Sequence, residues 1–230
     1  MIEHPLFGIS LTILVFSLFR KLQVKTKISL LNPLLFSSIL IILILIVFNI
    51  SYDDYNGGAK IFTSLIGPAT VALAIPLYKH QDLFYKNIKL ILISVLSSAI
   101  AHGLVITLLV YLFKLDLKLG ASLIPKSVTT AIAGDVSTAL GGYTNVTVAI
   151  VIITGIIGAS LAPLLNKVFN INSPIAQGLA LGSSAHAVGT SKAIELGETQ
   201  ETMATLALIL TGILTVFLSP FIYSALMYII

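Results

Sequence analysis

The chain has 230 residues, of which 57% are hydrophobic, while its 13 Lys and Arg and 9 Asp and Glu together make up only 10%. Since about a quarter of the residues in a soluble domain are charged, this composition and a mean hydropathy of +1.06 exclude a water-soluble monomer. The absence of cysteine excludes disulfides and cysteine-based metal sites, and the net charge of +4 forms no DNA-binding stripe, so we expect no nucleic-acid partner.

Long uncharged apolar stretches predict five ordinary membrane-spanning helices. A hydrocarbon layer about 30 Å thick takes about 20 residues of helix. The predicted spans are His4 to Phe19, Asn32 to Ile50, Leu90 to Phe113, Tyr143 to Asn166 and Thr202 to Tyr228. No basic segment precedes the first span and no signal-type cleavage site follows it, so we interpret it as a retained helix.

Three further segments have the length of a span but contain residues that break helices. Ile61 to Tyr78 contains Gly67-Pro68, Gly120 to Gly141 contains Pro125, and Ser173 to Ser191 is dense in Gly, Ser and Ala. Interrupted backbone persists in a bilayer only where protein or a wet cavity surrounds it. We therefore predict an all-α polytopic membrane protein of about seven or eight transmembrane segments, with broken or re-entrant helices inside the molecule.

The two halves of the chain follow a similar order of elements. A shift of about 112 to 113 residues superimposes related elements, for example Phe7 to Leu11 on Leu119 to Leu123. Paired interrupted helices in two halves are typical of secondary transporters, whose solute binds where the repeats meet. We predict a single transmembrane domain, residues 1–230, with repeat halves 1–113 and 119–230; chance similarity of apolar segments is the alternative.

Basic residues predict the orientation of the first half. Arg20, Lys21, Lys25 and Lys27 crowd one short connection that has no acidic residue. Such a connection is cytoplasmic, which places the N-terminus outside. Re-entry of residues 120–141 would invert the second half and place the C-terminus inside, whereas a full crossing would give eight spans and a parallel repeat.

Lys126 and Asp135 are the charged residues that we expect well within the membrane, where an ionisable side chain indicates function. Lys126 is followed by Ser127, Thr129 and Thr130, so a cation, hydroxyls and free N–H groups at a helix start would form a cradle for an anion. The alternative is a lysine that extends to the membrane surface. Asp135 would pair with Lys126, accept a coupling proton or bind a cation; its alternative role is a helix cap.

His186 lies among small residues that leave room for a solute or a facing half-helix. Imidazole changes charge near neutral pH, so His186 is a candidate proton carrier together with Asp135; the alternative is a hydrogen-bonded packing residue. Lys192 would lie at the mouth of the same cavity or act as an interfacial anchor, and we interpret His102 as an interhelical hydrogen-bonding residue. The remaining predicted solute contacts, on the two other broken segments, are Gly67, Pro68, Thr70, Ser183, Ser184, Gly189 and Thr190.

Sequence motifs of common enzyme classes are missing. There is no HExxH, GxSxG, Walker loop or glycine-rich Rossmann turn. Ser, His and Asp in apolar segments do not define a catalytic triad, because a triad is defined by geometry. We therefore expect a protein that is not an enzyme and has no cofactor or metal site.

Three motifs are specific enough to indicate a family. They are Gly67 to Lys79, then Pro125 to Thr130 with Gly141-Gly142, then His186 to Ala193. Through them the chain resembles the LrgB/CidB family of bacterial membrane proteins along nearly its whole length. Ala131 stands where many members have Pro, and Lys192 stands where many have Arg, which keeps the charge but loses the bidentate fork.

The resemblance implies two kinds of function. Bacterial members act with a small holin-like membrane protein in controlling murein hydrolase export and autolysis, while other members resemble carriers of pyruvate or, in plastids, of glycolate and glycerate. Basic groups, hydroxyls and broken-helix ends suit a small carboxylate. We therefore predict a carrier of small monocarboxylates in the bacterial plasma membrane that acts with a small LrgA/CidA-like partner, with the homo-oligomeric state open. The alternative is a holin/antiholin-like regulator that transports no solute.

Overall fold

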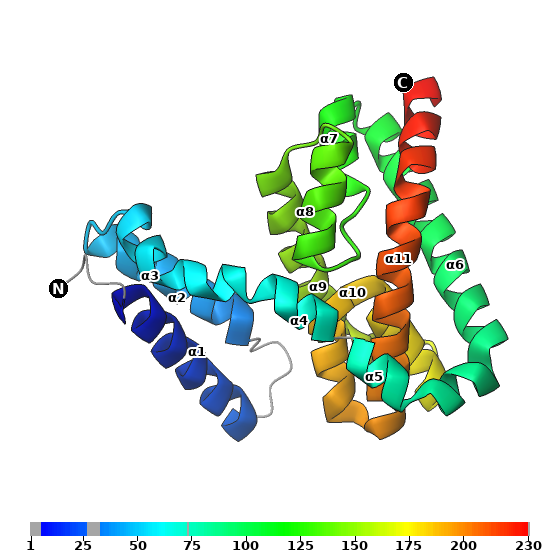
Figure 1. Cartoon of the computed structure of the whole chain (residues 1–230), viewed down its shortest axis with the longest axis horizontal. Coiled ribbons are helices and arrows are strands. Elements are labelled where there is room, and N and C mark those ends of the chain that lie inside the picture. Colours follow the sequence, from blue (N-terminus) through cyan, green and yellow to red (C-terminus); the bar gives the residue numbers. More distant parts are fainter. Residues whose placement is uncertain (1–5, 27–32, 73, 230) are drawn as a thin grey trace. The chain divides into compact units, whose positions relative to one another are not determined.

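The computed structural model describes residues 6–26, 33–72 and 74–229, except for the side chains of residues 66, 70, 74, 76 and 77. All regular secondary structure in these ranges is helical, which confirms the predicted all-α class (Figure 1). The helices are α1 (Leu6–Thr26), α2 (Pro33–Val47), α3 (Tyr52–Ser64), α4 (Ile66–Ala72), α5 (Ala74–Lys79), α6 (Gln81–Leu112), α7 (Leu117–Leu123), α8 (Thr130–Ala139), α9 (Thr144–Val168), α10 (Pro174–Leu196) and α11 (Glu198–Ile229).

Four of the described helices, α1, α6, α9 and α11, are long and apolar enough to cross a membrane. The most apolar stretch of each is at most 39% buried, so most of its surface is free to face lipid or another chain. The apolar helix α2 is shorter, with 15 residues. These helices define a multi-pass membrane protein, while the total of seven or eight spans stays a prediction.

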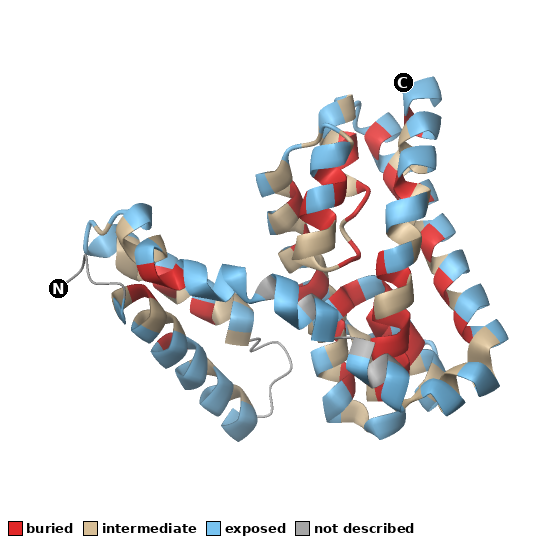
Figure 2. Cartoon of the chain, in the orientation of Figure 1, coloured by how far each residue is buried: buried red, intermediate tan, exposed pale blue. Residues whose placement is uncertain are grey.

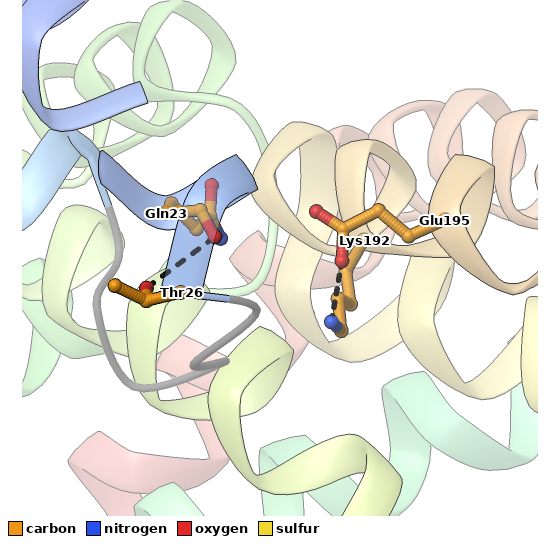
Figure 3. Close-up of polar contacts among 4 residues, drawn as sticks. All are labelled: Gln23, Thr26, Lys192 and Glu195. Atoms are coloured by element: carbon orange, nitrogen blue, oxygen red, sulfur yellow. Dashed lines mark hydrogen bonds and ion pairs between the residues drawn. The ribbon is translucent and has the colours of Figure 1, made fainter. Parts of the chain in front are cut away.

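Several helix boundaries differ from the predicted ones. Helix α1 continues to Thr26, so Arg20, Lys21 and Lys25 lie on its last turns and not in a connection as predicted; Lys27 is outside the described residues. The Thr26 hydroxyl donates to the Gln23 carbonyl at 3.5 Å at this end of the helix (Figure 3). The long basic side chains therefore extend from the helix itself, a geometry in which their charges reach the membrane surface while their stems cover apolar residues.

Helix α3 is a further difference, because its polar N-terminal half was not predicted to be helical. The Ser51 hydroxyl accepts a hydrogen bond from the Asp54 N–H at 3.1 Å and caps the helix. Asp53 and Asp54 lie in the first turn, where the helix dipole favours negative charge. Cap and dipole thus offset the low helix propensity of Gly57 and Gly58.

Of the three segments predicted to be broken, the second and the third are confirmed as broken. The first contains the end of α3, α4 and α5, with residue 73 between α4 and α5 outside the described residues, and the second is divided into α7 and α8 with residues 124–129 between them. The third is one helix, α10, with a kink at Ala185 (φ −119°, ψ 15°) and His186 (φ 42°, ψ −137°). Pro125 explains the second break, since proline has no N–H to donate within a helix.

Two compact units divide the chain, Met1–Ala72 and Leu73–Ile230. In the first unit α1 packs against α2 and α3. Gly8 of α1 lies against the backbone of Tyr55 and Ala59, and the hydroxyls of Thr12 and Tyr55 are 2.8 Å apart. This division is made by contacts and does not test the predicted repeat halves.

The second unit is held together by close packing of α10 on α11, which lie side by side. A Cβ on Gly178 would lie 2.5 Å from the Gln200 carbonyl oxygen, and one on Gly182 would collide with the Ala204 backbone. Glycine therefore lets the two backbones approach closely, as is common between membrane helices. Buried residues concentrate along these two helices (Figure 2). A core of Ile91, Val95, Leu179, Met203, Leu206 and Ala207 joins α6 to them.

Candidate functional site

Lys126 lies in the non-helical turn between α7 and α8 and is half-buried. The turn is closed by backbone hydrogen bonds from the Lys126 N–H to the Leu123 carbonyl (3.2 Å) and from the Val128 N–H to the Pro125 carbonyl (3.3 Å). Within the described residues the Lys126 ammonium has no ion pair and no hydrogen bond. An uncompensated charge at membrane depth costs about 3 kcal/mol or more, so this ammonium is suited to an anionic ligand.

Thr129 provides a second unsatisfied group beside Lys126. It is the N-cap residue of α8, but its side chain makes no capping hydrogen bond. Its Oγ1 is buried and has no partner among the described residues. The first N–H groups of a helix also have no acceptor within the helix, and α8 begins at Thr130. An anion here would meet a cation, a hydroxyl and backbone N–H groups together.

A small cavity of about 20 Å³, which we call the hydroxyl chamber, lies against this turn. Helix α6, the turn before α8, α10 and α11 each contribute to its wall. Its lining residues are Ser98, Ala99, His102, Ile124, Ser127, Ser183, Thr211, Thr215, Leu218 and Ile222. Thr211 is 3% exposed, and its Oγ1 has no hydrogen-bond partner in the described structure.

His102 connects α6 to the turn. Its Nε2 lies 2.8 Å from the Ile124 carbonyl oxygen, which agrees with the predicted interhelical hydrogen bond. This contact fixes the N-terminal part of the turn against a long apolar span.

His186 occupies the kink of α10. It is 3% exposed, and its Nε2 lies 2.9 Å from the Val151 carbonyl oxygen on α9. Gly155 faces the ring, because a Cβ there would lie 2.6 Å from His186 Cε1 and Nε2. His186 is therefore a hydrogen-bonded packing residue, as one alternative predicted, and its role as a proton carrier stays a prediction.

The second and third broken segments meet in the second unit. Ser127 from the turn and Ser183 from α10 line the same chamber. The Thr190 hydroxyl donates to the His186 carbonyl at 3.1 Å, just after the kink. The structure thus brings Lys126, Ser127, Thr129, Ser183 and His186 to the same part of the unit.

Other predicted site residues lie elsewhere. Asp135 is exposed on α8, lines a groove of about 390 Å³ with α11, and forms no ion pair with Lys126 in the described part of the chain. Lys192 Nζ lies 2.5 Å from a Glu195 carboxylate oxygen (Figure 3). Ser184 is exposed and donates to the Ala180 carbonyl at 2.6 Å.

The remaining predicted site residues are Gly189 and the residues of the first broken segment. Gly189 lies against the Leu181 carbonyl across the kink of α10, so its lack of a side chain serves packing there. Gly67 and Pro68 are exposed residues of α4 in the first unit. The side chain of Thr70 is outside the described structure. A role of this segment as the opposing wall of the site stays a prediction.

The hydroxyl chamber itself was missed in the sequence. Ser98 and His102 on α6 are four residues apart, and so are Thr211 and Thr215 on α11. Residues at this spacing share one face of a helix. Paired polar residues on otherwise apolar spans are the signal that would have indicated the chamber.

The fold and the cavity define a class: an all-helical, multi-pass membrane protein in which interrupted helices contribute to a small, hydroxyl-lined cavity. The sequence identifies the family within this class. A family model described as LrgB-like matches residues 12–225, and the chain belongs to this family.

Its relatives include bacterial proteins of nearly the same length. The chain is 38% identical over 217 residues to antiholin-like protein LrgB of Bacillus subtilis (strain 168), covering 94% of each chain. It is 39% identical over 215 residues to the uncharacterized protein YxaC of the same organism, covering 93% of each, and 35% identical over 217 residues to antiholin-like protein LrgB of Bacillus cereus (strain B4264), covering 94% of each. No solved structure matches the chain.

Proposed function

We propose that this protein carries small monocarboxylates, of the pyruvate, glycolate or glycerate class, across the bacterial plasma membrane. The observation that supports this proposal is the ammonium of Lys126, which has no partner in the described chain and lies near the buried, unpartnered hydroxyl of Thr129 at the start of α8. A pair of unsatisfied donors at membrane depth is costly without a ligand.

A carboxylate satisfies these donors because it only accepts hydrogen bonds. One oxygen would accept from the Lys126 ammonium, and the other from the Thr129 hydroxyl or from the first N–H groups of α8, with Ser127 and Thr130 beside them. The positive end of the α8 dipole adds to the attraction. A small anion suits the site because the adjoining hydroxyl chamber has a volume of only about 20 Å³.

The proton that would accompany the anion has two candidate carriers. His186 lies near Lys126 and is bound through Nε2 to the Val151 carbonyl, while Asp135 is exposed on α8. If His186 carries the proton, His186→Gln flattens the pH dependence of flux while keeping a side chain that donates to Val151. An unchanged pH profile would leave Asp135 as the candidate.

A second function is supported by the names of the relatives. Two of the bacterial relatives are antiholin-like proteins by name. On this reading the chain regulates murein hydrolase export and autolysis together with a small LrgA/CidA-like membrane protein and moves no solute. Flux of labelled pyruvate in vesicles that contain the chain, with and without such a partner, separates the two functions. Flux no higher than in empty vesicles under every pH gradient would favour the regulator.

The test of the site is Lys126→Ala. We expect this variant to insert normally into the membrane and to lose pyruvate flux, because its carboxylate site has lost its only cation. The matched control is Lys167→Ala, which removes an exposed lysine at the end of α9 and should keep flux. Normal flux in Lys126→Ala would remove Lys126 from the site.

A further inference from the structure

We propose that the hydroxyl chamber is a second subsite, which binds a hydroxyl or carbonyl oxygen carried by the carboxylate that Lys126 holds. Thr211 is its specificity-determining residue. This inference rests on the proposed function and deepens it, since it explains how the site distinguishes an oxygen-bearing acid from the same acid without that oxygen.

The first observation is that four of the five hydroxyls of the chamber are left available, the exception being Ser183, which donates to the Ala180 carbonyl at 3.4 Å. Serine and threonine in membrane helices commonly donate to the carbonyl four residues earlier. Residues of this chain that do so include Thr12, Ser38, Thr138, Ser184, Ser191, Thr205 and Ser224. Within the described residues the side chains of Ser98, Ser127, Thr211 and Thr215 make no hydrogen bond at all.

The second observation is the burial of Thr211. Its side chain is 3% exposed, and its Oγ1 has no access to solvent. A buried hydroxyl without a partner is costly, and native proteins contain few such groups. Thr211 lines the chamber, so we infer that a rotation of its side chain brings the hydroxyl to a ligand bound there.

Size and charge identify the ligand group. The volume of about 20 Å³ has room for a single water-sized oxygen and little more. The lining has no carboxylate, so nothing in it would compensate the charge of a cation. A neutral oxygen is left, either the second oxygen of the solute or a water molecule.

Position favours the oxygen of the solute. Ser127 lines the chamber and directly follows Lys126 in the turn. Lys126 and Thr129 are not lining residues themselves, but the turn that carries them contributes Ile124 and Ser127 to the wall, so we infer that a carboxylate held there has the chamber as its neighbour. Because hydroxyls hydrogen-bond an oxygen whether it donates or accepts, the subsite takes both a hydroxyl and a carbonyl substituent.

The experiment compares acids that differ by one hydroxyl. Glycolate and acetate are one such pair, and lactate and propionate are another. Binding of each to the purified full chain in nanodiscs is measured by calorimetry for the parent protein and for Thr211→Val, which replaces the hydroxyl by a methyl of similar size. The matched control is Thr205→Val on the same helix, whose hydroxyl donates instead to the Glu201 carbonyl at 2.9 Å.

We expect the parent protein to bind glycolate about tenfold more tightly than acetate, and lactate more tightly than propionate, because the acids without a hydroxyl leave Thr211 unpaired. Thr211→Val should lose about tenfold in affinity for the hydroxylated acids and change the other two by less than twofold. Thr211→Ser should restore the preference, and Thr205→Val should keep it.

Each contrary result has a distinct meaning. Equal loss of affinity for both members of a pair in Thr211→Val would place a structural water in the chamber and overturn the inference. An unchanged preference would also overturn it. Failure of the parent protein to bind any of the four acids, or binding unaffected by Lys126→Ala, would instead refute the proposed function.

Discussion

Gly155→Ala is the sharpest test of how α9 holds the kink in α10. A Cβ at position 155 would lie 2.6 Å from the ring of His186 and 3.0 Å from Val188 Cγ2. Both are closer than van der Waals contact allows. The ring must therefore move away, and its hydrogen bond to the Val151 carbonyl, 2.9 Å long, would break.

The cost follows from three contributions. Overpacking of a filled interior costs about 1 to 3 kcal/mol, and leaving the buried carbonyl and imidazole unpaired costs about 1 to 3 kcal/mol. The better helix propensity of alanine returns up to about 1 kcal/mol. We expect Gly155→Ala to lower the free energy of unfolding by roughly 1 to 5 kcal/mol.

The matched control is Gly134→Ala on α8, where the nearest atom to a new Cβ is Thr144 Cγ2 at 3.5 Å, an ordinary contact. This variant should be neutral or more stable by up to about 1 kcal/mol. Both are measured by SDS-titrated unfolding in mixed micelles, followed by circular dichroism. Equal stability of Gly155→Ala and Gly134→Ala would refute the packing of His186 against α9.

Three further results are expected. His186→Gly should be more stable than His186→Ala by about 1 kcal/mol in the same unfolding assay, because φ at this position is 42° and glycine adopts positive φ without strain; equal stability would mean that the kink relaxes in both. Thr129→Val should bind acetate about tenfold more weakly by calorimetry while the ligand-free protein loses no stability, since the removed oxygen has no protein partner; unchanged acetate affinity would take Thr129 out of the anion site. Gly182→Ala should lower the unfolding midpoint more than Gly134→Ala, since its Cβ would meet the Ala204 backbone, which has no side chain to move aside; equal midpoints would contradict the close approach of α10 and α11.

The broken segments could be predicted from the sequence because their cause is local. Pro125 removes a hydrogen-bond donor wherever it stands, and the glycine and serine residues around His186 lower the helix propensity of that segment. The kink angle at His186 could not be predicted, because it depends on the Val151 carbonyl 35 residues earlier. The position of a helix break can thus be predicted from local residues, whereas the kink angle depends on contacts with distant parts of the chain.

The anion site was partly predictable for the same reason. Lys126, Ser127 and Thr129 follow one another in the chain, so their chemistry can be recognised together. Thr211 is 84 residues from Ser127 along the chain, and only the folded structure shows that both line one chamber. The predicted pairing of Lys126 with Asp135 failed to form because α8 turns Asp135 to an exposed face.

The contact between α10 and α11 limits how this protein can move. A Cβ on Gly178 would lie 2.5 Å from the Gln200 carbonyl oxygen and 2.7 Å from Met203 Cβ, so the backbones of the two helices are in close contact. We therefore expect α10 and α11 to move together as one rigid element. For the proposed carrier, we therefore expect alternate exposure of the anion to the two sides of the bilayer to depend on movement at residues 124–129 and at the kink of Ala185 and His186.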